Sequence, residues 1–305
     1  MTKKKILITG ANGLLGQKLI DLYLKKEGKE IIATGIGPCR HPEKEKFKYI
    51  ILDITKKEQV ESVFAEVMPD AVIHTAAMTN VDACETDKEG CDALNVHAVE
   101  YIAESCKKHN SHLVHISTDF IFDGTSGPLD EEAVPNPLSY YGWSKLKGEN
   151  IVREVTQNWA ILRTVLVYGV VQDMSRSNIV LWAKGALEKQ QDIRVVDDQF
   201  RTPTLAEDLA MGCFLAEDQH AQGIYNISGK DFMSIYELVE RVADFYGLSK
   251  NHMHKSDSST LNQPAKRPPI TGFKVDKAMK DLGYQPHGFE EGLAIVNRQL
   301  EESLT

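Results

Sequence analysis

The fold of this chain is decided by its first strand and the loop that follows, Lys5-Ile6-Leu7-Ile8-Thr9-Gly10-Ala11-Asn12-Gly13-Leu14-Leu15-Gly16. A short apolar run ends in glycines spaced G-x-x-G-x-x-G, and a helical pattern follows at once. Glycines let the backbone approach a phosphate closely, and a helix N-terminus offers N–H groups and the positive end of a dipole. The stretch predicts a dinucleotide-binding loop. Its binding residues would be Gly10, Asn12, Gly13, Leu14, Leu15 and Gly16.

Two hydrophobic periods alternate in the first half of the chain. Strand-like runs occur at 5–9, 30–34, 71–75, 113–117 and 160–167, and helix-like stretches at 14–26, 56–67, 91–108 and 139–156. Such alternation is typical of a parallel sheet with right-handed crossover helices on both faces. The sequence therefore predicts an α/β fold with a doubly wound, parallel, Rossmann-type sheet.

The regular alternation of strand-like and helix-like segments ends at about residue 169. Helical patterns occur at 175–189, 205–216 and 234–246, short strands at 193–196 and 224–227, and a polar, breaker-rich stretch at 249–269 is expected to be mostly irregular. We predict an NAD(P)-binding domain over 1–168 and a smaller α+β substrate-binding lobe over 169–305. Residues 204–225 are expected to pack back on the first domain.

Composition excludes several classes of protein. The 305 residues carry 35 Lys and Arg against 44 Asp and Glu, for a net charge of −9, which disfavours nucleic acid or an anionic membrane as a partner. No apolar run approaches the ~20 residues of a membrane span. The five cysteines contain no C-x-x-C pair. We therefore expect reduced thiols in a cytoplasmic protein.

The residues after the second strand bear on the choice of cofactor. In many dinucleotide-binding folds an acid at this point binds the adenosine ribose, but here the strand runs into Thr34-Gly35-Ile36. Arg40 follows a few residues later, and a guanidinium can accommodate a 2′-phosphate. This favours NADPH, with NADH as the alternative. Equally, Arg40 could simply point into solvent.

Two further strand ends are expected to border the cofactor. Asp53 and Ile54 follow the third strand, where the Asp53 carboxylate could accept from an adenine amino group. Ala76 and Ala77 follow the fourth strand, where small side chains would let a cofactor pass close to the sheet. His74 is expected in the core rather than in the chemistry.

A catalytic group is predicted from Thr118, Tyr141 and Lys145. Tyr141 and Lys145 are four residues apart on an expected helix and so share a face. A lysine ammonium nearby should lower the pKa of the tyrosine, which is ~10 when free. Thr118 ends a parallel strand at the edge where such sheets bind ligands, so its hydroxyl could bind a substrate carbonyl oxygen while Tyr141 protonates it.

With these motifs, the chain resembles the extended short-chain dehydrogenases/reductases, and specifically the dTDP-4-dehydrorhamnose reductase family. The resemblance extends over nearly the whole chain. Besides the glycine loop, Ala76-Ala77 and the Tyr141/Lys145 pair, it rests on Ser117-Thr118-Asp119, Phe122-Asp123-Gly124, Arg163-Thr164, Val167-Tyr168-Gly169, Asp198-Gln199-Phe200, Pro203-Thr204 and Arg267-Pro268.

The resemblance implies NADPH-dependent reduction of the 4-keto group of a nucleotide-linked deoxysugar. It implies that Tyr141 donates the proton, that Lys145 binds the nicotinamide ribose and tunes Tyr141, and that Thr118 holds the keto oxygen. Asp119 is expected to touch the sugar, and Phe122 to line the substrate site. The partner is then a nucleotide sugar, with no nucleic acid, no membrane and no metal ligands assigned. A homodimer is one option for the assembly.

The chain departs from the family pattern in the expected substrate lobe. Arg201 stands where the family has glycine, Ile270 replaces an amide, and Ser177-Asn178-Ile179 replaces Asn-x-Phe. Basic residues of this chain could make bidentate contacts to a substrate diphosphate. The candidates are Arg163, Arg176, Arg201, Lys266 and Arg267, of which Arg201 and Arg267 are favoured.

Two alternatives remain. One is a nucleotide-sugar epimerase or dehydratase of the same fold, for which Asp119 is the clear additional acid–base candidate. The other is a non-catalytic regulatory subunit, similar to the β subunit of methionine adenosyltransferase.

Overall fold

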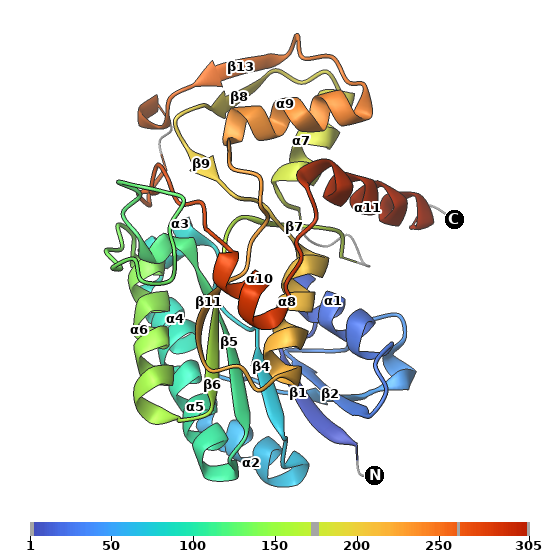
Figure 1. The fold of residues 1–305 in the computed structure, drawn as a ribbon, viewed down its shortest axis with the longest axis vertical. Helices are drawn as coiled ribbons and strands as arrows, with labels where there is room; N and C mark the ends of the chain where they lie inside the picture. The colour runs from blue at the N-terminus through green and yellow to red at the C-terminus, as the bar shows by residue number, and fades with distance from the viewer. Residues whose placement is uncertain (1–2, 172–176, 261–262, 304–305) are drawn as a thin grey trace.

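A computed structural model describes residues 3–171, 177–260 and 263–303, and is built around a seven-stranded sheet (Figure 1). The strand order is β11-β6-β5-β4-β1-β2-β3 and every neighbouring pair is parallel. This confirms the doubly wound parallel fold. The strands are β1 (Lys4–Thr9), β2 (Lys29–Gly35), β3 (Lys48–Ile51), β4 (Ala71–His74), β5 (His112–Thr118), β6 (Trp159–Thr164) and β11 (Gly223–Asn226).

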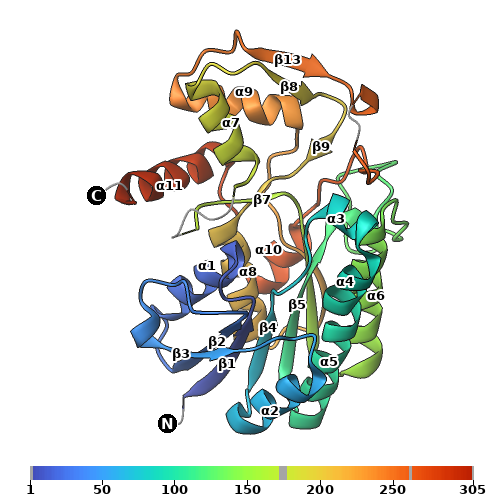
Figure 2. The same ribbon diagram turned by 180° about the vertical axis from the view of Figure 1, so that it is seen from behind.

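Helices cover both faces of the sheet (Figures 1 and 2). Ile6 and Ile8 of β1 pack toward α1 (Leu14–Tyr23), α8 (Ala206–Asp218) and α10 (Asp276–Leu282). Leu7 points to the opposite face, toward α2 (Lys57–Val67), α5 (Ala98–His109) and α6 (Tyr140–Val155). Because successive side chains alternate between two buried faces, the strand reads as a continuous apolar run.

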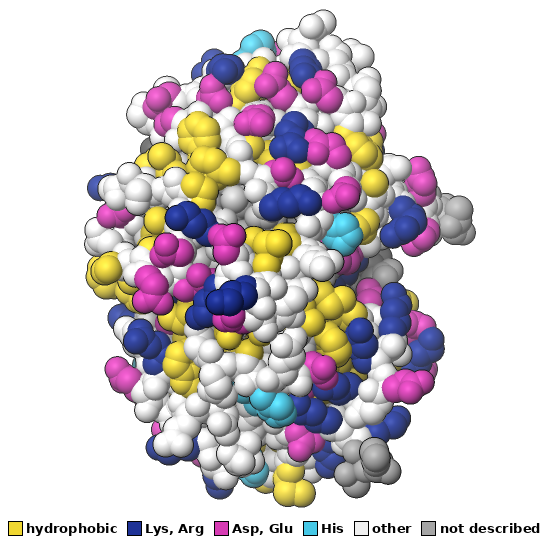
Figure 3. Space-filling model, viewed as in Figure 1, with side chains coloured by type: hydrophobic (Ala, Val, Ile, Leu, Met, Phe, Trp, Pro, Cys, Tyr) yellow, Lys and Arg dark blue, Asp and Glu magenta, His cyan; other side chains and the backbone are white. Residues whose placement is uncertain are grey.

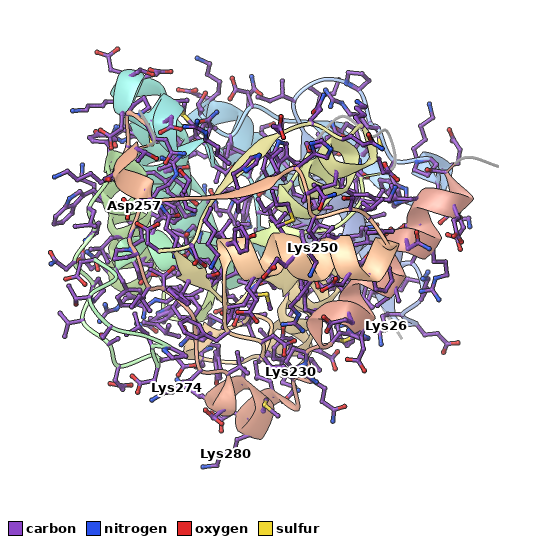
Figure 4. The ribbon with its side chains drawn as sticks, turned by 90° about the horizontal axis from the view of Figure 1, so that it is seen from above. Lys26, Lys230, Lys250, Asp257, Lys274 and Lys280 are labelled. Atoms are coloured by element: carbon purple, nitrogen blue, oxygen red, sulfur yellow. The ribbon has the colours of Figure 1, made fainter. Side chains whose placement is uncertain are left out.

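A second core lies in the C-terminal lobe. It is formed by α7 (Ile179–Glu188), α9 (Ile235–Tyr246), α11 (Phe289–Glu302) and the parallel pair β8 (Ile193–Val196) and β13 (Met253–Ser256). Figure 4 looks down on this lobe, with Lys250 near α9 and Asp257 near the turn that follows β13. Two small strand pairs lead into it. They are β7 (Val167–Tyr168) with β10 (Thr204–Leu205), and β9 (Phe200–Arg201) with β12 (Met233–Ser234).

Several predicted elements differ in detail. The strand predicted over 160–167 is broken, because β6 ends at Thr164 and Leu166 has a φ of 39°. The helix predicted over 91–108 is interrupted by a π-helical segment, Ala93–His97. The stretch 249–269 contains β13. Arg176 and the start of the predicted helix 175–189 lie outside the described residues.

The remaining elements are short. They are α3 (Val81–Thr86), α4 (Lys88–Asp92) and the 3₁₀ turns Lys44–Lys46, Asp119–Ile121 and Ser258–Thr260.

The surface carries mixed charge. Basic and acidic side chains are interspersed over the face shown in Figure 3. Among the helices of the described ranges, none combines the length and the apolar character needed to cross a bilayer.

A buried ion pair joins α6 to the sheet. The Arg163 guanidinium of β6 donates through Nε and Nη2 to the two carboxylate oxygens of Glu149, at 2.9 and 2.8 Å. The two side chains are 3% and 0% exposed. From the sequence, Arg163 was a candidate to bind a substrate diphosphate. In the structure its guanidinium is bonded to Glu149, which gives Arg163 a structural role.

We predict that Glu149→Gln lowers the free energy of unfolding by about 3–5 kcal/mol, because it leaves the buried Arg163 charge without its counter-ion. Urea denaturation with an unchanged m-value measures the loss. Glu104→Gln, which removes the exposed partner of Lys57, is the control and should leave the midpoint almost unchanged. Equal effects of the two substitutions would contradict the prediction.

Candidate active site

The candidate site lies at the carboxyl edge of β1, β4 and β5. These three strands are adjacent and parallel, so the residues that follow them meet at one edge of the sheet. The chain passes from β1 to β2 on one side and later to β4 on the other, which makes this edge a topological switch point. The glycine loop, Ala76-Ala77 and Thr118 therefore come together here.

The glycine loop is packed against the end of β4. Gly10 has a φ of 72°, and a Cβ on it would lie 2.7 Å from Thr75 Oγ1 and 2.8 Å from Ala76 N. A Cβ on Gly16 would lie 2.3 Å from the carbonyl oxygen of Gly10. Gly13 precedes α1, and in the described structure no side chain caps the helix. N–H groups of the first turn can thus face an anion, so the loop fits a dinucleotide pyrophosphate.

Asn12 joins the glycine loop to the residues after β2. Its Oδ1 accepts from Arg40 N at 2.9 Å, and its Nδ2 donates to the carbonyl oxygen of Pro38 and to the hydroxyl of Tyr49, both at 3.0 Å. These bonds bring Arg40, which is exposed, beside the loop. β2 ends at Gly35, without an acid.

The other predicted cofactor residues lie on the same edge. Asp53 Oδ1 accepts from the backbone N–H and the hydroxyl of Thr55, at 3.0 and 2.7 Å. Ile54 is buried, and Ala76 and Ala77 are half-buried. The contact of Asp53 with an adenine stays a prediction.

The predicted catalytic side chains are brought together and buried. Thr118, Tyr141 and Lys145 are 6%, 7% and 4% exposed. Ser139 caps α6 by accepting from Gly142 N, which sets the start of the helix one residue before Tyr141. Lys145 Nζ donates to the carbonyl oxygen of Ile116 at 2.7 Å.

The pKa of Tyr141 differs from the sequence-based expectation. We predicted that Lys145 would lower it, but burial raises the pKa of Tyr141, the Asp119 charge raises it further, and a hydrogen bond with Thr118 opposes them. Burial also lowers the pKa of Lys145 to about 8, although Glu149 acts in the opposite direction. Tyr141 therefore keeps its proton near neutral pH, as a proton donor must. His74 is buried, and burial lowers its pKa to about 3, as expected of a core histidine.

The residues assigned to the substrate have protein partners in the structure. Asp119 and Arg201 are 2% and 4% exposed and face each other. Burial raises the pKa of Asp119, and the Arg201 charge opposes this. Arg267 makes a bidentate ion pair with Asp82 at 2.8 and 3.2 Å. Phe122 packs in a small core against Phe273.

Sequence reasoning missed two buried polar residues at this edge. Asn95, in the π-helical segment, accepts from Met78 N at 2.9 Å and donates to Ser144 Oγ at 3.0 Å. It ties the residues after β4 to α6, and π-segments are frequent at functional sites. An amide within an apolar helical stretch was the available signal. Thr271, fully buried, bonds to Asp119, and no local pattern indicated this.

Comparison with known proteins identifies the family of this chain. The family model of the RmlD substrate binding domain matches residues 4–301. The chain belongs to this family. It is 31% identical over 97% of its length to the dTDP-4-dehydrorhamnose reductase of Aggregatibacter actinomycetemcomitans, covering 99% of that protein. It is also 31% identical to methionine adenosyltransferase 2 subunit beta of Xenopus tropicalis, over 82% of this chain and 74% of that one.

The fold also matches a solved structure. The dTDP-4-dehydrorhamnose reductase of Bacillus anthracis, described in complex with NADP, superposes with a TM-score of 0.84 at 27% identity, covering 98% of this chain and 100% of that one. These matches confirm the predicted family and fold. They also support the expectation of an oxidoreductase, because both dTDP-4-dehydrorhamnose reductases match nearly the whole of this chain.

We predict that Gly10→Ala destabilises this RmlD-family protein and abolishes dinucleotide binding, because its Cβ would push the glycine loop off Ala76. Gly28→Ala is the matched control: Gly28 has a φ of 75°, but nothing lies within 4 Å of its added Cβ. It should lose only the roughly 1–2 kcal/mol of a left-handed residue. Thermal unfolding and fluorescence titration with NADPH measure both effects. Retained NADPH affinity in Gly10→Ala would show that the loop is not the binding site.

Proposed function

We propose that this protein reduces the 4-keto group of a nucleotide-linked deoxysugar with NADPH. The observation that carries the proposal is the grouping of Thr118, Tyr141 and Lys145 at the sheet edge that also holds the glycine loop. The relative from Aggregatibacter, similar over nearly the whole chain, is a dTDP-4-dehydrorhamnose reductase. The nucleotide sugar itself is carried over from this likeness.

Each residue of the trio has a separate task. A bound nicotinamide would supply the hydride for the carbonyl carbon. The Tyr141 phenol, which burial keeps protonated, donates its proton to the carbonyl oxygen. The Thr118 hydroxyl binds the same oxygen and orients it. The Lys145 ammonium, now on the carbonyl oxygen of Ile116, would hold the nicotinamide ribose.

The lobes divide the work between cofactor and substrate. We propose residues 1–168 for the cofactor and 169–305 for the sugar, with 204–225 packed on the first lobe. The pairing of β11 with β6 supports this. Arg40, held beside the glycine loop through Asn12, supports a preference for NADPH over NADH.

The geometry favours the reductase over the two alternatives. A dehydratase needs a further acid or base, but Asp119 is bonded to Thr118 and Thr271 and faces Arg201. A non-catalytic subunit, suggested by the similarity to methionine adenosyltransferase 2 subunit beta, needs no intact trio.

We propose the cytoplasm as the compartment of this protein. Cys39, Cys84, Cys91, Cys106 and Cys213 are free, which supports the reducing cytoplasm as its compartment. A homodimer stays a prediction.

The proposal is tested by mixing the protein with dTDP-4-dehydro-L-rhamnose and NADPH, then NADH, and following the absorbance of the reduced nicotinamide. We expect stoichiometric oxidation, faster with NADPH. Cofactor binding without oxidation would contradict the reductase and favour a regulatory subunit. Turnover without net oxidation would favour an epimerase or dehydratase.

We predict that Tyr141→Phe lowers kcat roughly 100- to 10,000-fold, the range of general acid catalysis, while the Kd for NADPH stays nearly unchanged. Tyr140→Phe is the matched control on the same helix. It removes a hydroxyl that donates to Asp92 at 2.8 Å, away from the trio, and should retain activity. Full activity of Tyr141→Phe would exclude it as the proton donor.

A further inference from the structure

A cluster of buried polar side chains adjoins Thr118. Asp119, Arg201 and Thr271 are 2%, 4% and 0% exposed. They come from distant parts of the chain: the turn after β5, strand β9 and the segment that follows Pro269. Arg201 is also the residue that replaces the glycine of the family pattern, so this guanidinium is a feature of this chain.

The Asp119 carboxylate is the centre of the cluster. Its Oδ1 accepts the hydroxyl proton of Thr118 at 3.1 Å. Its Oδ2 accepts from the hydroxyl of Thr271 and lies 3.6 Å from Arg201 Nε. Oδ1 thus faces Thr118, and Oδ2 faces two residues of the C-terminal half of the chain.

The Arg201 guanidinium is fixed by its remaining donors. Nη1 donates to the carbonyl oxygens of Phe200 and Pro269 at 2.7 and 3.0 Å, and Nη2 donates to that of Pro268 at 2.7 Å. Two of these acceptors belong to residues 265–274, which we call the strap. The strap therefore helps to hold the Arg201 guanidinium where its Nε faces Asp119.

The strap is held against the first lobe at both ends and in the middle. Arg267 binds Asp82 of α3, and Lys274 N, in the last residue of the strap (labelled in Figure 4), donates to the carbonyl oxygen of Leu129 at 2.8 Å. Pro269 lies on Gly124, where φ is 75° and a Cβ would meet Pro269 N at 2.7 Å. The Phe-Asp-Gly motif thus ends in glycine because the strap occupies the space of a side chain.

We propose that Asp119, Arg201 and Thr271 are positioning residues that orient the Thr118 hydroxyl, so that docking of the strap completes the active site. The inference rests on the proposed reductase function, in which the Thr118 hydroxyl binds the carbonyl oxygen of the substrate.

The electrostatics of burial explain the arrangement. A buried carboxylate is costly unless it is paired and fully hydrogen-bonded. Thr118 has one hydroxyl proton, so its bond to Asp119 is given up when that proton turns to a substrate carbonyl oxygen. Arg201 and Thr271 keep the carboxylate bonded during that exchange. Without them, Asp119 would compete more strongly for the Thr118 proton, or move away from it.

A double-mutant cycle tests whether the cluster acts through Thr118. We expect Arg201→Met to lower kcat by roughly 10- to 100-fold, since a 1 Å misplacement of a reacting group can cost about 100-fold. KM for NADPH should stay unchanged. In the Thr118→Val background, Arg201→Met should cause no further loss, because residues that act as a unit are non-additive. Arg194→Met, on the exposed side of β8, is the control.

A second pair of variants covers the case in which Arg201→Met does not fold. Thr271→Val, nearly isosteric, should lower kcat like Arg201→Met, and Thr271→Ser should restore it by returning the hydroxyl. Additive losses in the cycle, or equal activity of the Thr271 variants, would overturn the proposal.

A measurement without substrate separates this inference from the proposed function. In protein labelled with carbon-13 at tyrosine Cζ, the Tyr141 signal is assigned by its loss in Tyr141→Phe. We expect Thr271→Val and Arg201→Met to shift this signal toward its position in Thr118→Val. An unmoved signal overturns the inference. If the parent protein fails to reduce the sugar but the signal moves as expected, the proposed function fails and the positioning of Thr118 stands.

Discussion

The parallel pairing of β1 with β4 and of β4 with β5 is the constraint on which the rest of the site depends. Parallel neighbours deliver their carboxyl ends to one edge, and here that edge receives a glycine loop, a pair of alanines and a threonine. The backbone of Gly10 touches that of Ala76 so closely that no side chain fits between them. The glycine loop is therefore packed directly on the end of β4, the strand beside β5, which ends in Thr118.

Burial sets the chemistry at this edge. It raises the pKa of Tyr141, lowers that of Lys145 and keeps His74 neutral. Each of these groups has a defined partner: Thr118 for Tyr141, a backbone carbonyl for Lys145 and the Thr9 hydroxyl for His74. A buried polar group without a hydrogen-bond partner is costly. These partners therefore determine how the O–H and N–H groups of the three side chains are oriented.

The strap makes the site depend on both halves of the chain. Arg267 reaches Asp82, and Thr271 reaches Asp119 across 152 residues of sequence. Tyr141 lies on α6, which the ion pair of Glu149 with Arg163 joins to the sheet. In contrast, Arg201 and Thr271, which face Asp119, come from the C-terminal half. The proposed reduction of a sugar near Thr118 would thus depend on the contacts of the strap with the first lobe.

Local sequence determined the parallel α/β fold, the glycine loop and the Tyr141/Lys145 pair, because hydrophobic period and residue spacing act within one element and its turn. Only the tertiary structure decided what the charged residues do. Arg163 and Arg201 looked like ligands for a diphosphate because a sequence shows a charge but not its partner. Their carboxylates, Glu149 and Asp119, lie on other elements. The direction of the Tyr141 pKa shift escaped prediction for the same reason: burial is a property of the packed molecule, and burial is the largest cause of this shift.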